Sequence, residues 1–308
     1  MSGTGRIPMT AAERKRIAWI TAAALAVFVG MRFLPTGTNL NHMDFRVSGG
    51  NAIEFCDPSN PQFIPVVAVR SPVAMTVQWE APPATGREGR GVVMLKTASG
   101  KPVEAQDLLV AHTRKLHLLI VDPTLTDYQH VHPEPGRARG EWTITWTPRS
   151  AGAYRVFADF TPAATGRGLY ASAEAEVAAV EGAAQAQALT GPADARSPYT
   201  FALAAAVRPT RAGQPADLKF SITRGDGGAV PLEPVMGAFA HLVAFDEARS
   251  GFAHLHPAEE DLTIKPDATR PELNFKIMIP KAGRYVIWAQ VKLGGREEFA
   301  PFPLEVAP

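Results

Sequence analysis

The sequence contains a single cysteine, Cys56, in 308 residues. No disulfide can form within the chain, and neither a paired-cysteine zinc knuckle nor a two-cysteine haem-attachment motif is present. An excess of charge of one sign is also lacking, because 31 basic residues stand against 30 acidic ones and the basic residues are scattered. Nucleic-acid-binding proteins normally carry a clustered basic patch. We therefore exclude nucleic acid as a partner.

Catalytic motifs are missing as well. The chain has no Gly-x-Ser-x-Gly nucleophile elbow, no glycine-rich phosphate loop after a strand and no His-Glu-x-x-His zinc motif. Its acidic residues fall mostly at expected turns and edges, where solvated charge is the usual reason for them, so none is assigned as a general acid or base. We predict that the protein is not an enzyme.

One apolar run is long enough to suggest a membrane helix. Residues 17–31 carry no charge, and the run reaches eighteen residues at position 34. Eighteen helical residues span about 27 Å, which nearly matches a hydrocarbon core of about 30 Å if the terminal arginine snorkels. No small-x-small cleavage site follows, so we favour an uncleaved anchor over a signal peptide. The predicted anchor residues are Ile17, Trp19, Gly30 and Arg32.

The basic cluster Arg14-Lys15-Arg16 precedes this run and predicts a cytoplasmic N-terminus. The expected location is therefore the bacterial inner membrane, in contact with the lipid bilayer, with the bulk of the chain in the periplasm. We predict a cytoplasmic tail at 1–16, a transmembrane helix at 17–34 and a periplasmic stalk at 35–65.

Beyond the stalk the pattern changes to short β-type runs separated by turn signals such as Pro82-Pro83 and Ser99-Gly100. About six such runs fall in each half, with no helical pattern between them. This spacing predicts an all-β fold of two tandem, immunoglobulin-like antiparallel sandwiches. The expected domains are residues 66–180 and 198–308, joined by an Ala/Gln-rich linker at 181–197.

A histidine-containing segment occurs twice. Leu116-His117-Leu118 is followed thirteen residues later by His130-Val131-His132-Pro133, and Ala240-His241-Leu242 is followed at the same spacing by His254-Leu255-His256-Pro257. The offset is 124 residues for each pair. A second signature, Ala151-Gly152-Ala153-Tyr154, returns as Ala282-Gly283-Arg284-Tyr285 at an offset of 131. Its tyrosine is expected to hold a neighbouring turn through its hydroxyl group.

Two interpretations of the repeated histidines stand side by side. Residues two apart in a strand point to the same face, so each His-x-His pair projects together, and the leading histidine joins it if the strands form a hairpin. Three imidazoles suit zinc or copper. The other interpretation is a buried hydrogen-bonded cluster with a structural role. The candidate metal ligands are His117, His130, His132, Met236, His241, His254 and His256.

Met236 enters that set because it stands five residues before a leading histidine, at the position that His112 occupies in the first repeat. A methionine beside imidazoles favours copper in a periplasmic setting. The exchange of histidine for methionine puts a uniform copper site in doubt.

On its His-x-His-Pro and Ala-Gly-x-Tyr signatures, within about residues 105–175 and 232–306, the chain resembles bacterial membrane-anchored periplasmic proteins with tandem immunoglobulin-like domains, some associated with copper or heavy-metal handling. It also resembles, more faintly, the extra periplasmic subunits of photosynthetic reaction-centre complexes. The resemblance implies a non-enzymatic accessory subunit of a larger membrane complex, with other membrane-protein subunits as partners. The alternative is a periplasmic copper- or heavy-metal-binding protein that uses the repeated histidines.

Overall fold

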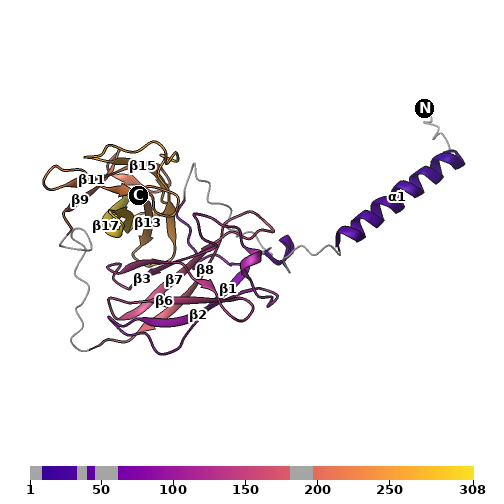
Figure 1. The fold of residues 1–308 in the computed structure, drawn as a ribbon, viewed down its shortest axis with the longest axis horizontal. Coiled ribbons are helices and arrows are strands. Elements are labelled where there is room, and N and C mark those ends of the chain that lie inside the picture. The colour runs from indigo at the N-terminus through magenta and orange to yellow at the C-terminus, as the bar shows by residue number, and fades with distance from the viewer. Residues whose placement is uncertain (1–8, 33–39, 46–61, 181–196) are drawn as a thin grey trace. The chain divides into compact units, whose positions relative to one another are not determined.

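The computed structural model describes residues 9–32, 40–45, 62–180 and 197–308. Its one long helix, α1 (Ala11–Arg32), belongs to a compact unit formed by residues 1–39, and the β-strands belong to a second unit formed by residues 40–308 (Figure 1). Much of the predicted stalk, including Cys56, and nearly all of the predicted linker lie outside the described residues.

Helix α1 contains most of the predicted transmembrane span at residues 17–34. Within the described residues, no helix is both long and apolar enough to cross a membrane. The helix begins six residues before position 17 and includes Glu13 and the Arg14-Lys15-Arg16 cluster. The predicted anchor residues all lie on this helix.

The first half of the β-rich unit contains two antiparallel sheets, with strand orders β1-β2-β6-β5 and β4-β3-β7-β8. A short 3-10 turn, η1 (His42–Phe45), precedes them and another, η2 (Ala105–Asp107), lies between β2 and β3. The strands are β1 (Val73–Trp79), β2 (Gly89–Thr97), β3 (Leu116–Val121), β4 (Tyr128–Val131), β5 (Glu134–Pro135), β6 (Glu141–Trp146), β7 (Gly152–Phe160) and β8 (Leu169–Val177).

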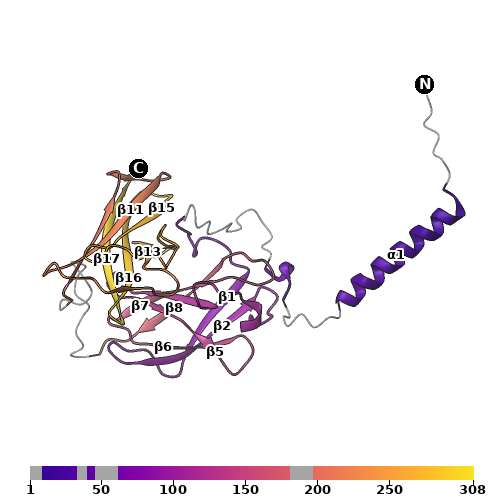
Figure 2. The same ribbon diagram turned by 45° about the horizontal axis from the view of Figure 1, so that its top comes forward.

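The second half repeats this arrangement with two further sheets, ordered β15-β11-β9 and β10-β17-β16-β13-β14, and β12 pairs with β16 (Figure 2). Its named strands pair in antiparallel fashion except β10 with β17. The strands are β9 (Tyr199–Ala205), β10 (Thr210–Arg211), β11 (Pro215–Arg224), β12 (Leu232–Glu233), β13 (His241–Asp246), β14 (Phe252–Leu255), β15 (Glu272–Met278), β16 (Gly283–Leu293) and β17 (Arg296–Ala307).

The burial patterns explain how these sheets pack. In β6, Trp142, Ile144 and Trp146 are buried and alternate with less buried residues, as expected for a strand with one face on a core. All six residues of β3 are buried, because both of its faces are covered. One face packs inside the first sandwich and the other joins a core shared with the second half. The fold is therefore all-β, as predicted.

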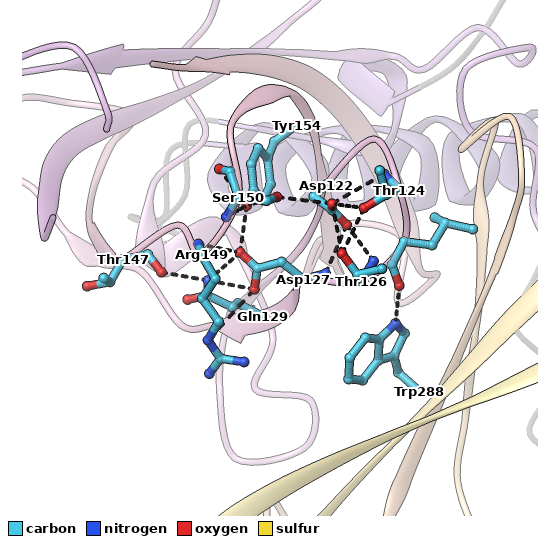
Figure 3. Close-up of polar contacts among 11 residues, drawn as sticks. Asp122, Thr124, Thr126, Asp127, Gln129, Thr147, Arg149, Ser150, Tyr154 and Trp288 are labelled. Atoms are coloured by element: carbon cyan, nitrogen blue, oxygen red, sulfur yellow. Dashed lines mark hydrogen bonds and ion pairs between the residues drawn. The ribbon is translucent and has the colours of Figure 1, made fainter. Parts of the chain in front are cut away.

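The shared core fixes the two halves against each other. Leu119 and Phe157 of the first half pack with Phe245 and Trp288 of the second. The indole nitrogen of Trp288 also donates a hydrogen bond across the interface to the carbonyl oxygen of Leu125 at 3.2 Å (Figure 3). Since Trp288 is 1 % exposed, the interface around it is as buried as a domain core.

The repeated tyrosine holds a turn in both halves, as the sequence predicts. The hydroxyl group of Tyr154 donates to Asp127 at 2.6 Å and accepts from the backbone N–H of Ser150 at 3.0 Å (Figure 3). The hydroxyl group of Tyr285 donates to the carbonyl oxygen of Lys281 at 3.0 Å. The first turn is the more elaborate one because its tyrosine also satisfies a fully buried carboxylate.

We expect Tyr154→Phe to lower the free energy of unfolding by about 1.5 to 3 kcal/mol, because a buried carboxylate loses a charge-assisted hydrogen bond. The matched variant Tyr285→Phe removes a bond to a neutral carbonyl and should cost about 1 kcal/mol. Urea unfolding of both variants measures the difference. Equal losses would show that Asp127 draws no stability from Tyr154.

Candidate metal centre

The strand register of each repeat brings three histidines to one sheet face. His130 of β4 pairs directly with Leu119 of β3, and His117 lies two residues before Leu119 on the same strand. His132 follows His130 by two positions, just beyond the end of β4. Because paired residues and residues two apart share a face, all three imidazoles point the same way. In the second repeat β13 and β14 place His241, His254 and His256 by the same register.

In each repeat the three imidazoles converge closely enough to share one ion. One ring nitrogen from each histidine lies within 4.8 Å of the other two. The nitrogens His117 Nδ1 and His130 Nε2 are 3.1 Å apart, and His241 Nδ1 and His254 Nε2 are 3.3 Å apart. We call His117, His130 and His132 the first set and His241, His254 and His256 the second set.

The two sets adjoin each other across the interface between the halves. Ring centroids of His130 and His254 are 5.6 Å apart, and those of His117 and His254 are 6.1 Å apart. Within the sets the corresponding distances are 4.7 to 5.4 Å. His112 completes the group, since its ring stacks on that of His256 at 3.8 Å. Seven of the eight histidines of the chain therefore form one cluster.

The outer nitrogens of the leading histidines are held by backbone carbonyls. His117 Nε2 lies 3.0 Å from the carbonyl oxygen of Ala111, and His241 Nε2 lies 3.0 Å from that of Val235. A carbonyl oxygen only accepts, so the imidazole must donate from Nε2. In the neutral ring the proton is then on Nε2, and the inner Nδ1 carries a lone pair.

The outer nitrogens of the middle histidines are held by side chains of the opposite half. His130 Nδ1 lies 2.9 Å from Gln290 Oε1, and His254 Nδ1 lies 3.2 Å from Asp159 Oδ2. Gln290 directs its amide N–H to Glu297 at 2.8 Å, which leaves its oxygen for the histidine. Both oxygens accept, so both middle histidines are protonated on Nδ1 and direct a lone pair inward from Nε2.

With the outer nitrogens protonated, the inner nitrogens of the leading and middle histidines face each other, and each carries a lone pair. In the neutral tautomers so assigned, His117 and His130 meet as two acceptors at 3.1 Å, and His241 and His254 meet in the same way at 3.3 Å. Two acceptors do not form a hydrogen bond. A cation between them, either a proton or a metal ion, would remove the repulsion between the two lone pairs.

Burial disfavours the proton. Desolvation lowers the pKa of His130 and His254 well below the usual value, and neighbouring histidines lower it further. Desolvation also lowers the pKa of His132 to about 3 and that of His241 to about 4. At neutral pH these imidazoles are therefore uncharged, which is the form that binds metal ions.

The third histidine of each set has one unsatisfied ring nitrogen. His132 Nε2 and His256 Nε2 are both buried, and neither has a hydrogen-bond partner within the described residues. Buried polar atoms are normally paired. The same unsatisfied atom at the same position of both repeats is therefore evidence for a bound group that would satisfy it.

A cavity of about 390 Å³ opens onto the cluster. It is lined by histidines of both sets and by Glu259 and Glu260. His112, which is exposed, also lines it. The cavity gives an ion or a small ligand a route to the buried nitrogens.

The structure thus brings together the six histidines that the sequence singled out, and it adds His112. The backbone of Met236 has the same left-handed conformation as that of His112, with φ 48° in both, and its role as a ligand stays a prediction. Sequence reasoning missed Asp159 and Gln290. These two residues are 131 positions apart, the offset of the repeated tyrosine signature, and that coincidence could have identified them.

No curated protein matches the sequence. Among solved structures, the chain is similar to red sea bream transglutaminase, with 8 % identity, a TM-score of 0.24 and coverage of 78 % of this chain and 32 % of that chain. It is similar to a DUF4785 family protein from Legionella pneumophila, with 8 % identity, a TM-score of 0.23 and coverage of 74 % and 55 %. It is also similar to the Escherichia coli adhesin FdeC, with 15 % identity, a TM-score of 0.21 and coverage of 76 % and 64 %.

The chain spans less than two thirds of the length of each of these three structures. A family model described as a domain of unknown function, DUF8832, matches residues 71–178 and 194–308, which include both histidine sets and both tyrosine signatures. This chain therefore belongs to the DUF8832 family.

Proposed function

We propose that the protein binds two transition-metal ions, copper or zinc, one in each histidine set. The observation that carries the proposal is the pair of facing lone pairs in each set, at 3.1 and 3.3 Å, with every outer nitrogen of the leading and middle histidines held by an acceptor. Metal-bound histidines characteristically donate their other N–H to a carbonyl or carboxylate, which orients the ring.

The spacing of the nitrogens supports ions of this size. Two imidazole nitrogens bound tetrahedrally to zinc at about 2.05 Å are separated by about 3.3 Å. The observed separations of 3.1 and 3.3 Å agree with this value. Imidazole nitrogen suits zinc and copper better than it suits magnesium or calcium, which prefer oxygen ligands. Each set offers three protein ligands, and the adjoining cavity leaves room for a further exogenous one.

The proposal favours metal binding over the purely structural interpretation of the histidines. A structural cluster would pair donors with acceptors, whereas here the inner nitrogens of four histidines face one another as acceptors. The experiment is a calorimetric titration of the metal-stripped full chain with Zn²⁺ and with Cu²⁺. Elemental analysis then counts the bound ions. Two ions bound per chain are expected. Binding of none would contradict the proposal.

A second candidate function is that of an accessory subunit of a larger bacterial membrane complex. One observation favours it: α1 leaves large apolar side chains exposed, with Trp19 at 73 %, Ile20 at 69 % and Phe28 at 68 %. Such a surface suits docking against other protein subunits. The location at the inner membrane, the contact with lipid and the immunoglobulin-like topology stay predictions from the sequence.

For this candidate we expect the full chain, purified from its native membranes in a mild detergent, to elute with other subunits. Deletion of residues 1–34 should abolish that association and leave metal binding intact, because both histidine sets lie in the other unit. Mass spectrometry of the eluted fractions makes the comparison. Elution of the full chain by itself would contradict the accessory role.

A further inference from the structure

The two histidine sets are equivalent in sequence, but the residues that hold their middle histidines are not. Gln290 of β16 holds His130 of the first set, and Asp159 of β7 holds His254 of the second set. Each holding residue comes from the half of the chain opposite to the histidine that it contacts. The two correspond in the repeat, so a pair of duplicated positions now carries an amide on one side and a carboxylate on the other.

From this difference we infer that the two metal sites are unequal, and that Asp159 makes the second set the tighter site, which fills first. The inference rests on the proposed function and deepens it. Asp159 acts as a positioning residue, because its carboxylate bonds to the outer nitrogen of His254 and not to the nitrogen that faces the metal.

The charge of the carboxylate is the physical reason. A carboxylate that accepts from Nδ1–H raises the basicity of the imidazole and strengthens the bond that Nε2 makes to a cation. The side chain of Asp159 is only 19 % exposed, so water screens this charge weakly. The neutral amide of Gln290 orients its histidine equally well but supplies no charge, although its hydrogen bond is shorter, at 2.9 Å against 3.2 Å.

Asp159 also lies opposite His117 of the first set in the pairing of β3 with β7, but its carboxylate bonds to the imidazole of His254. The carboxylate that is linked to His130 lies one side chain further away, beyond Gln290. Glu297 accepts from the amide of Gln290 at 2.8 Å, and it is exposed. Its charge is therefore both more distant from the ion and screened by water. The chain of contacts from His130 through Gln290 to Glu297 therefore raises the basicity of His130 less than direct contact with Asp159 raises the basicity of His254.

The test is a calorimetric titration of the metal-stripped full chain with Zn²⁺. For the unaltered chain we expect two steps of different affinity. Asp159→Asn keeps an acceptor oxygen and removes the charge, so it should weaken the tighter step by about 10- to 100-fold and leave the other step in place. Gln290→Glu combined with Glu297→Gln retains a hydrogen bond between those two side chains and moves the charge next to His130. This double variant should strengthen the weaker step.

Single-set variants assign each step. His130→Ala leaves the second set intact, and His254→Ala leaves the first. We expect Asp159→Asn to change the Cu²⁺ electron paramagnetic resonance spectrum more in the His130→Ala background than in the His254→Ala background, because its carboxylate bonds to His254 and only lies opposite His117 in the strand pairing. A purely structural role of Asp159 would leave the spectrum of the copper that remains bound unchanged.

Several results would overturn the inference while leaving the proposed function intact. They are two ions bound with equal affinity in the unaltered chain, an Asp159→Asn variant that weakens both steps alike, and a tighter step that survives in His254→Ala but not in His130→Ala. The absence of any Zn²⁺ binding would instead overturn the proposed function itself. Urea unfolding of each metal-free variant shows whether the fold is retained.

Discussion

Replacement of both middle histidines, His130→Ala with His254→Ala, is expected to abolish stoichiometric metal binding, and each single replacement is expected to reduce it from two ions per chain to one. Each middle histidine contributes the nitrogen that faces the leading histidine at 3.1 or 3.3 Å. Without it, a set keeps only two imidazoles, which is fewer than zinc sites in proteins normally use. We expect the affinity of an altered set to fall by at least 100-fold.

The matched control for this experiment is His42→Ala. His42 is the one histidine outside the cluster, and it is exposed at the start of η1. Its removal should leave both ions in place. If His42→Ala and the double variant lose metal to the same degree, binding is non-specific and the assignment of the two sets is wrong. Elemental analysis after gel filtration provides the count.

Metal binding is also expected to stabilise the β-rich unit strongly. An ion that binds only the folded state stabilises it by about 2.7 kcal/mol when its free concentration is 100 times the Kd, so two sites give about 5 kcal/mol. For a unit of this size, each kcal/mol raises Tm by about 2 to 4 °C. Saturating Zn²⁺ should therefore raise Tm by at least about 10 °C, and a chelator should reverse the shift.

Part of this stabilisation is expected to come from the interface between the two halves. Each middle histidine is oriented by a residue of the opposite half, so a bound ion favours the docked arrangement in which both sets are complete. The double variant His130→Ala with His254→Ala serves as the control in differential scanning calorimetry, and Zn²⁺ should leave its Tm unchanged. An equal rise of Tm in this variant would place the stabilising ion elsewhere in the protein.

The purely structural interpretation makes the opposite prediction for the unaltered chain. If the histidines served only to hold turns and strands, added metal would not change the unfolding transition, and a chelator would have no effect. The facing lone pairs and the unsatisfied nitrogens of His132 and His256 would then be uncompensated costs of folding. Calorimetry with and without Zn²⁺ therefore separates the two interpretations in a single comparison.

The sequence by itself determined the all-β class and the local geometry of each histidine set. Alternating apolar residues, as at Trp142, Ile144 and Trp146, are a property of a strand with one covered face, and strand periodicity is readable from a single sequence. The thirteen-residue spacing from His117 to His130 lies within one hairpin, so local pairing is enough to bring the imidazoles together. The turn held by each repeated tyrosine is local in the same sense.

The N-terminal helix shows how far that reasoning extends. Helix formation near Ile17 follows from local composition. The start of α1 at Ala11, which draws four charged residues into the helix, does not follow from an apolar run. Element boundaries depend on caps, and here the side chain of Thr10 accepts from the backbone of Glu13 while Glu13 reaches back to the backbone of Thr10.

Only the tertiary structure decided that the two sets form one centre. Hydrophobic periodicity shows that both faces of β3 are covered, but it does not identify the surface that covers the outer face. That surface is the second half of the chain, and contacts between residues 95 to 163 positions apart bring His130 to Gln290, His254 to Asp159 and Trp288 to Leu125. The proposed inequality of the two metal sites rests on these long-range contacts, because the histidine motifs themselves are the same in both repeats.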